Sequence, residues 1–156
     1  MTIHDHELWL FIRESNKIED IHREPTETEF IAHKTLLGLK KVRVQDVERF
    51  VFLVADAEIR SKLGMNVTVG NHIPPVGGPH IVDGLEKILQ AVNHKHSNPY
   101  TTHVKYETLH PFLDGNGRSG RALWLKMMVR NGYDGSLGFL HMWYYQSLDG
   151  ARKRDK

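Results

Sequence analysis

Apolar side chains recur every three or four positions along several segments of the chain, and this spacing predicts a protein built mainly of helices. Residues 7–21 place their apolar side chains on one helical face. Thr26 and Glu29 form a capping box, which predicts the start of a second helix. Asp46 is expected to cap a third helix that ends near Gly64, because glycine readily takes the left-handed conformation found at helix ends.

The second half of the chain carries further helix signals. Asp83 and Glu86 predict another capping box, and Asn98 followed by proline predicts a helix start, since proline is favoured in a first turn. Residues 118–130 are expected to be helical, and a last helix is expected over residues 140–148. The chain therefore predicts about seven helices.

One segment breaks the helical pattern. Residues 67–73 alternate apolar and polar side chains around a Gly-Asn pair, which predicts a short β-hairpin. Prolines and glycines crowd residues 74–79 and exclude regular structure there. The expected fold class is all-α, a compact helical bundle with one short hairpin.

The stretch His110-Pro-Phe-Leu-Asp-Gly-Asn-Gly-Arg-Ser-Gly-Arg121 differs from the rest of the chain. Its glycines allow a compact turn in which the backbone approaches a ligand closely, and successive amide groups in such a turn form an anion site. The turn leads into a helix N-terminus, which favours negative charge. Arg118 and Arg121 share one face of that helix, and guanidinium groups suit phosphate oxygens.

Two more side chains in this stretch point to nucleotide chemistry. Asp114 is a hard oxygen ligand of the kind that Mg²⁺ takes together with substrate phosphates. His110 has an ordinary pKa near ~6.5 and suits proton transfer at neutral pH. No Gly-Lys-Ser/Thr follows the glycines, so the stretch is not a Walker motif. The alternative is a glycine-rich turn between helices with surface arginines.

The stretch resembles the signature of the Fic family, H-x-F-x-D/E-G-N-G-R-x-x-R. Every fixed position of the signature is matched, by His110, Phe112, Asp114, Gly115, Asn116, Gly117, Arg118 and Arg121. Residues 103–109 resemble the segment that precedes the family signature, and residues 66–76 resemble its target-binding flap hairpin. The resemblance covers nearly the whole chain, so it implies that residues 1–156 form a single Fic domain, with the flap beside the active site.

The resemblance implies an enzyme that transfers AMP from ATP to a protein hydroxyl. His110 would deprotonate the attacking Ser, Thr or Tyr, and Asp114 would hold Mg²⁺. The α-phosphate would be held by Asn116 and by the amides of Gly115 and Gly117.

The remaining nucleotide contacts implied by the resemblance lie further along the chain. Arg118 would take the β-phosphate and Arg121 the γ-phosphate, and Gly120 is counted among the nucleotide-binding residues. Tyr144 would line the adenine pocket, and Arg152 stands where the family often has Asn.

The first predicted helix resembles the family's inhibitory motif, S/T-x-x-x-E-G/N. Ser15 and Glu19 match, and Asp20 replaces the usual Gly or Asn. Ser15 and Glu19 share a helix face. A carboxylate paired with Arg121 would take the place of the γ-phosphate, so the resemblance implies autoinhibition. The alternative is an ordinary amphipathic helix with Glu19 in solvent.

Three other functions compete with AMP transfer. Doc-type relatives phosphorylate their targets and carry Lys where this chain has Gly117, which argues against them. Removal of AMP, with Glu19 positioning a water molecule, is a second alternative. A catalytically silent Fic fold that only binds a partner is a third, and the intact His110, Asp114 and Arg121 argue against it.

Composition narrows the partners and the compartment. The formal net charge of +2 is too small to predict a nucleic acid or membrane partner. The chain has no Cys, which excludes disulfides, Cys-bound metals and thiol nucleophiles. It also lacks any apolar run of the ~20 residues that a membrane span needs, and its acidic start is unlike a signal peptide, so we expect a cytoplasmic protein.

Eleven histidines invite a metal interpretation, but their spacing does not favour one. His4 and His6, like His94 and His96, are two residues apart and diverge on a helix. The expected metal is Mg²⁺ on Asp114 and phosphate oxygens. The expected partners are ATP and a target protein, with self-modification and oligomers both possible.

Overall fold

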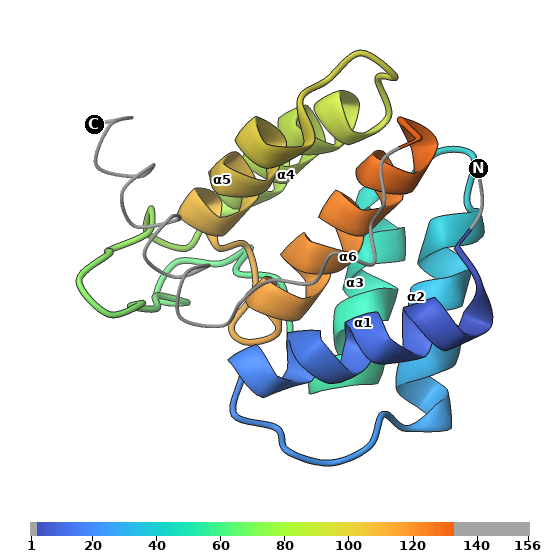
Figure 1. Ribbon diagram of the computed structural model, residues 1–156. Coiled ribbons are helices and arrows are strands. Elements are labelled where there is room, and N and C mark those ends of the chain that lie inside the picture. The colour runs from blue at the N-terminus through green and yellow to red at the C-terminus, as the bar shows by residue number, and fades with distance from the viewer. Residues whose placement is uncertain (1–2, 133–156) are drawn as a thin grey trace.

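The computed structural model describes residues 3–132, and this part of the chain folds into six helices, which confirms the all-α prediction (Figure 1). The helices, in chain order, are α1 (Asp5–Ile18), α2 (Glu27–Gly38), α3 (Val44–Ala55), α4 (Pro79–Val92), α5 (Pro99–Leu109) and α6 (Asn116–Arg130). The predicted last helix and Tyr144 lie outside the described residues. No helix in the described range is both long enough and apolar enough to span a membrane.

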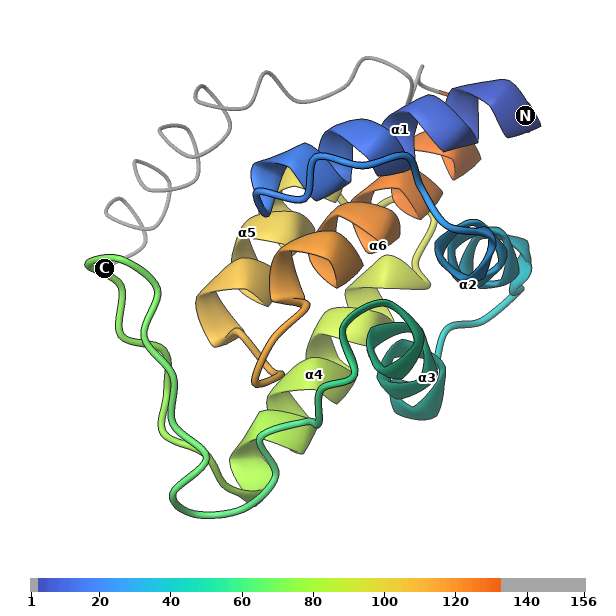
Figure 2. The ribbon, with the colours of Figure 1, turned by 90° about the horizontal axis from the view of Figure 1, so that it is seen from below.

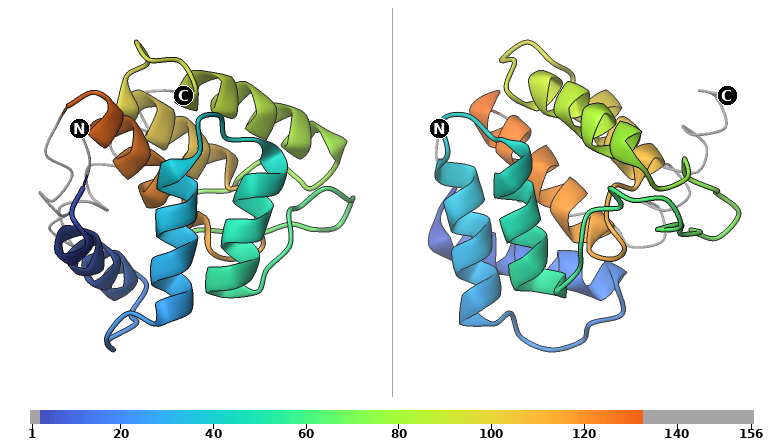
Figure 3. Two further views of the ribbon diagram at one scale, coloured as in Figure 1. Left: turned by 90° about the vertical axis from the view of Figure 1, so that its right-hand side faces the viewer. Right: turned by 180° about the vertical axis from the view of Figure 1, so that it is seen from behind.

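Helix α6 lies in the middle of the bundle. Figure 2 shows α4 and α5 on one side of it, α2 and α3 on another, and α1 lying across it. Figure 3 shows α2 and α3 as an antiparallel pair. The main core lies between α6 and its neighbours α2 to α5, and includes Leu36, Phe50, Leu85, Tyr106 and Leu123.

Helix α1 is fixed by a second, smaller core. Leu8, Phe11 and Ile12 are buried against Leu125 of α6. Phe11 also stacks on Trp124, with ring centroids 6.3 Å apart. Residues 110–115, called the signature loop below, join α5 to α6. Because α1 packs along α6, the C-terminal end of α1 lies close to this loop.

Of two helix starts predicted from cap residues, the structure confirms one and corrects the other. The Thr26–Glu29 box is present, with the Glu29 amide donating to Thr26 Oγ1 over 3.1 Å and the Thr26 amide to Glu29 Oε1 over 2.8 Å. Asp46 is not the cap of α3. It lies in the first turn, where its carboxylate accepts from the amide of Arg43, the residue that precedes the helix.

The prediction that α3 continues to Gly64 is wrong. The helix ends at Ala55, and Asp56 adopts a left-handed conformation with φ 49°. Aspartate tolerates this conformation better than most residues, so the helix can end there without glycine. The chain then turns back, and Ile59 pairs with Phe112 of the signature loop in an isolated antiparallel bridge.

Helices α4 and α6 begin earlier in the chain than the sequence predicts. Helix α4 begins at Pro79, four residues before the predicted cap Asp83, because a proline in the first turn starts the helix directly after the breaker-rich segment. Helix α6 begins at Asn116, two residues before the predicted start. The Asn98 cap of α5 is confirmed, with its side chain accepting from the Thr101 amide.

Of the predicted hairpin, the structure shows only the turn, closed by one isolated bridge. Val69 and His72 exchange two backbone hydrogen bonds of 3.0 and 2.8 Å around Gly70, but no longer ladder forms. An isolated two-stranded hairpin is marginal in water, and the prolines that follow cannot donate to a ladder. Residues 66–76, called the flap segment below, form an extended loop on the outside of the bundle (Figure 1).

Candidate active site

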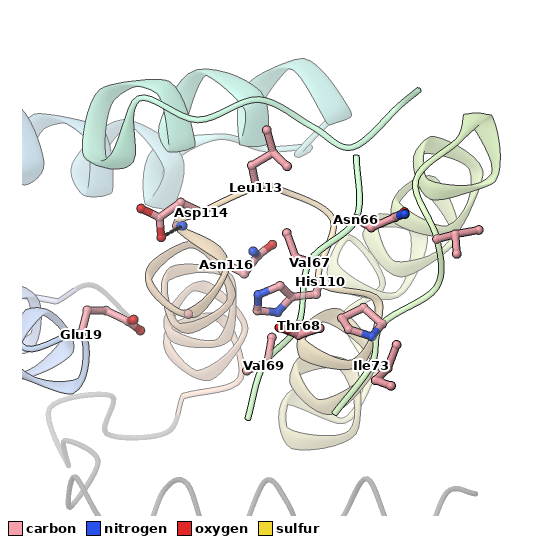
Figure 4. Close-up of a pocket in the computed structure, with 14 residues that line it drawn as sticks. Glu19, Asn66, Val67, Thr68, Val69, Ile73, His110, Leu113, Asp114 and Asn116 are labelled. Carbon is pink, nitrogen blue, oxygen red and sulfur yellow. Dashed lines mark hydrogen bonds between the residues drawn. The ribbon is translucent and has the colours of Figure 1, made fainter. Parts of the chain in front are cut away.

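His110 ends α5 in a strained backbone conformation. Its φ and ψ are 51° and 64°, and its amide donates to the Tyr106 carbonyl over 2.9 Å. A non-glycine residue rarely adopts this conformation, which costs of order 1–3 kcal/mol, so the surrounding structure must hold it there. The turn aims the imidazole into a cavity between the signature loop and the flap segment (Figure 4).

The side chain of Asn116 closes the signature loop. Its Oδ1 accepts from the Phe112 amide and its Nδ2 donates to the Phe112 carbonyl, both over 2.8 Å. Both polar groups of this buried side chain are therefore engaged by the loop. Asn116 also lines the cavity, and its expected contact with an α-phosphate stays a prediction.

Gly115 gives the loop its close approach to α3. Its φ is 81°, and a Cβ atom added there would lie 2.8 Å from the Cβ of Ala55. Any side chain at this position would strain the backbone and also push α3 away.

The N-terminal end of α6 forms one wall of the cavity. Gly115, Asn116 and Gly117 line it, and no side chain in the described part of the chain caps this helix end. The first amides of a helix have no intrahelical acceptor and carry a partial positive charge. This wall is therefore suited to an anion such as a phosphate group.

The two signature arginines are buried and engaged with other groups. Arg118 donates to the Val54 carbonyl over 2.7 Å. Arg121 is 0% exposed and donates three hydrogen bonds to α1 and its C-cap. Its acceptors are Ser15 Oγ at 2.8 Å, the Ser15 carbonyl at 2.9 Å and Glu19 Oε1 at 2.8 Å.

Glu19 thus forms an ion pair with a fully buried guanidinium group. The carboxylate is 29% exposed and also borders the cavity. Gly117 makes room for it, because a Cβ atom at that position would lie 2.1 Å from Glu19 Oε1 and 2.8 Å from Arg121 Nη1. We call the contacts of Glu19 with Arg121 the latch.

A role of Glu29 beyond capping was missed at the sequence level. Its buried carboxylate accepts from Asn16 at 3.0 Å and from Arg23 at 2.7 Å, and so ties the end of α1 to the start of α2. Burial raises its pKa, but the hydrogen bonds from Arg23, Thr26 and Asn16 outweigh burial and lower the pKa to about 2. Residues 16 and 29 belong to different helices, and no sequence spacing predicts their contact. Only the structure shows that Glu29 holds the end of α1.

The cavity has a volume of about 640 Å³ and three kinds of lining. Figure 4 shows the flap segment on one side, the signature loop with the start of α6 on another, and Glu19 at the edge. The lining residues are Glu19, Asn66, Val67, Thr68, Val69, Ile73, Pro74, Val76, His110, Leu113, Asp114, Gly115, Asn116 and Gly117. An imidazole, two carboxylates and the N-terminal end of a helix therefore meet in one space.

Gly120 does not belong to this cavity. A Cβ atom there would lie 2.1 Å from Glu107 Oε1 and 2.9 Å from Tyr106 Cδ1, both on α5. Its carbonyl accepts from the Nδ1 of buried His103 over 3.1 Å. Gly120 therefore serves the packing of α6 on α5, and its expected contact with nucleotide stays a prediction.

The model of the family described as Fic/DOC matches residues 14–128. This chain belongs to the Fic/DOC family. The match includes the signature loop, α6 as far as residue 128, and both Ser15 and Glu19.

Curated relatives of this Fic/DOC protein match over a shorter stretch. "Protein adenylyltransferase Fic" of Drosophila melanogaster is 35% identical over 74 residues, which is 43% of this chain and 15% of that protein. The protein of the same name from Drosophila willistoni is 36% identical over 73 residues, with the same shares. The chain therefore matches only about a seventh of the length of these relatives.

The family implies Mg²⁺, and the residues present fit it in one respect. The Asp114 side chain is 69% exposed beside the cavity, with Oδ1 accepting from the Gly115 amide over 2.7 Å. Among the described residues no group of three or more His, Asp or Glu side chains could hold a metal. A magnesium ion here would take one carboxylate from the protein and its other ligands from phosphates and water, as Mg²⁺ commonly does.

Proposed function

We propose that this protein transfers AMP from ATP to the hydroxyl of a Ser, Thr or Tyr side chain on a protein. The observation that carries the proposal is the cavity that joins His110, Asp114 and the uncapped start of α6. Membership of the Fic/DOC family and the printed name of the matched relatives, protein adenylyltransferase, support it.

The chemistry follows from the lining of the cavity. The target hydroxyl oxygen attacks the α-phosphorus, a new P–O bond forms, and the bond to pyrophosphate breaks. His110 accepts the hydroxyl proton, a contribution typically worth 10²–10⁴ in rate. The amides at the start of α6 stabilise the negative charge that develops on the α-phosphate. Mg²⁺ held by Asp114 would neutralise phosphate charge when bound.

We further propose that the latch inhibits this reaction. Arg121 is the side chain that the γ-phosphate would use, and Glu19 occupies it over 2.8 Å. ATP must then displace the carboxylate to reach its full set of contacts. The burial of Arg121 and the anchoring of α1 by Glu29 support a latch that is closed at rest.

Gly117 favours AMP transfer over Doc-type phosphorylation. A Lys at this position, as in Doc-type relatives, would begin with a Cβ atom 2.1 Å from Glu19 Oε1. A side chain at residue 117 would therefore have to displace the Glu19 carboxylate from its present position.

Labelled ATP tests the proposal. The purified protein is incubated with Mg²⁺ and ATP labelled either on the α- or on the γ-phosphate, and incorporation into itself and into lysate proteins is measured. We expect strong α-label incorporation for Glu19→Gly, weak incorporation for the parent, and a loss of 10²-fold or more in Glu19→Gly/His110→Ala.

The outcomes separate the candidate reactions. Incorporation of the γ-label instead would indicate phosphotransfer, and release of AMP from modified protein without incorporation would indicate the reverse activity. Equal activity of the parent and Glu19→Gly would contradict the latch. Glu14→Ala is the matched control, since Glu14 lies on the same helix and, within residues 3–132, pairs only with the surface residues Arg13 and Lys17.

A further inference from the structure

One buried arginine outside the signature connects the end of α5 to the flap segment. Arg60 is 0% exposed, although its side chain is long and charged. Its Nε donates to the His110 carbonyl over 2.7 Å and its Nη2 to the Leu109 carbonyl over 2.8 Å. Its Nη1 donates to the carbonyls of Pro75 at 2.8 Å and Met65 at 3.1 Å.

These four carbonyls belong to two segments of different function. Leu109 and His110 form the end of α5 and carry the predicted base. Met65 directly precedes the flap segment and Pro75 lies near its other end, so the guanidinium group closes this segment at its base. Both segments are held by one rigid, planar group whose donors have fixed relative directions.

The backbone of Arg60 strengthens the same connection. Its amide donates to the Pro111 carbonyl over 2.8 Å, and its own carbonyl accepts from the Gly78 amide over 3.0 Å. Farther along the flap segment, His72 Nε2 donates to the Thr108 carbonyl over 2.9 Å. The flap segment is therefore attached to the end of α5 at its base and at its turn.

Among the residues that the structure describes, no carboxylate neutralises the charge of Arg60. None of the ion pairs found in residues 3–132 includes it. Burial lowers the pKa of Arg60 from its ordinary value, which is the expected cost of a desolvated guanidinium group. A core of apolar residues would fill this space without that cost, so the four directed hydrogen bonds are the property that distinguishes arginine here.

We propose that Arg60 is a positioning residue that fixes the distance between the flap segment and His110. The inference rests on the proposed function, in which a target hydroxyl lies beside the flap segment and gives its proton to His110. Such a transfer requires the two heavy atoms to come within about 2.6–3.2 Å. A misplacement of about 1 Å costs roughly 10²-fold in rate, so the rigidity of this link matters to the reaction.

The proposal separates target positioning from nucleotide binding. Arg60 makes none of its four side-chain hydrogen bonds to residues 114–121. A change at Arg60 should therefore leave the KM for ATP nearly unchanged while it lowers kcat. A residue with only a general structural role would not produce this split.

The test combines hydrogen exchange with transfer kinetics in the Glu19→Gly protein. Arg60→Gln and Arg60→Lys are compared with Arg49→Gln, which changes an exposed arginine on α3. We expect Arg60→Gln to speed amide exchange in residues 66–76 and 109–112 together, with α6 unchanged. Self-modification with ATP and Mg²⁺ should lose 10- to 100-fold in kcat, with KM for ATP within twofold.

The conservative variant and the independent exchange measurement decide between explanations. Arg60→Lys keeps the charge and a part of the hydrogen bonds, so it should recover part of kcat and of the protection from exchange. Unchanged exchange in residues 66–76 for both variants would overturn the proposal. Faster exchange throughout the core would also overturn it, because Arg60 would then serve stability in general. If exchange became faster in residues 66–76 and 109–112 together but the protein transferred no AMP, the proposed function would be refuted. The connection that Arg60 makes between the flap segment and His110 would still be supported.

Discussion

Replacement of Glu19 by Gly should raise the affinity of the protein for ATP. The substitution removes the carboxylate that now pairs with Arg121 and leaves the two hydrogen bonds from Arg121 to Ser15. Glu19 is the C-cap residue of α1, where glycine is well tolerated, so the helix itself should persist. ATP would then no longer compete with this carboxylate for the Arg121 guanidinium group.

The size of the effect follows from the contact that is lost. A hydrogen bond between charged groups contributes about 1.5–3 kcal/mol, and ATP must offset this amount to open the latch. Converted at 1.4 kcal/mol per tenfold, the affinity should rise by about 10- to 150-fold. Because Glu19 is 29% exposed and its charge is partly screened, we expect a value near the lower end of this range.

Isothermal titration with ATP in the presence of Mg²⁺ measures the change directly. Glu14→Ala serves as the control and should bind ATP as the parent does. A dissociation constant for Glu19→Gly within twofold of the parent, in a protein that still unfolds cooperatively, would refute the latch.

Three further predictions concern stability and are measured by chemical denaturation. Gly117→Ala should lower the free energy of unfolding by about 1–3 kcal/mol in the parent and by less in Glu19→Gly, because the added Cβ clashes with the Glu19 carboxylate. Gly120→Ala should cost about 1–3 kcal/mol in both backgrounds, because its clash is with α5. The free energy of unfolding should also fall as the pH falls, in two ranges. Between pH 6.5 and 4 the loss comes from His33, because burial lowers its pKa to about 4. Between pH 4.5 and 2 the loss comes from Glu29, whose pKa is about 2.

The direction of the pH effect follows from proton binding. The unfolded chain binds a proton at His33 and at Glu29 at higher pH than the folded chain does, so acid favours unfolding in both ranges. Each shift corresponds to roughly 3 kcal/mol. His33→Gln should remove the upper part of the slope and Glu29→Gln the lower part. Slopes that persist in these variants would contradict the assignment.

Gly38→Ala is the matched control for the glycine variants. A Cβ atom there would meet nothing within 4 Å, so we expect a change of no more than about 0.5 kcal/mol. Equal losses of stability for Gly38→Ala and Gly120→Ala would show that close packing does not set the cost. Additive effects of Gly117→Ala and Glu19→Gly would contradict the predicted clash.

Much of the helical pattern could be predicted because it depends on local signals. The Thr26 and Asn98 caps act through neighbouring amides, and the structure confirms both helix starts. The end of α3 could not be predicted in this way. Asp56 takes a left-handed conformation there because the chain must turn back for Ile59 to pair with Phe112, which lies far away in the sequence.

The site shows the same division between local and distant causes. His110, Asp114 and the start of α6 are close together in the sequence, within one signature. They could therefore be predicted to lie together in the structure. The packing of Gly120 on α5 could not be predicted, because a pattern does not say which side of α6 a residue faces. Arg60 carries no sequence signal, since its four acceptors are backbone carbonyls, which every sequence contains.

Mass spectrometry of a modified protein tests the central claim most directly. The Glu19→Gly protein is incubated with ATP and Mg²⁺ in a lysate, and peptides are searched for added mass. We predict the mass of one AMP group on Ser, Thr or Tyr hydroxyls, and its loss in Glu19→Gly/His110→Ala. The account would be contradicted if the added mass were that of a phosphate group alone, or if the AMP modification persisted in the absence of His110.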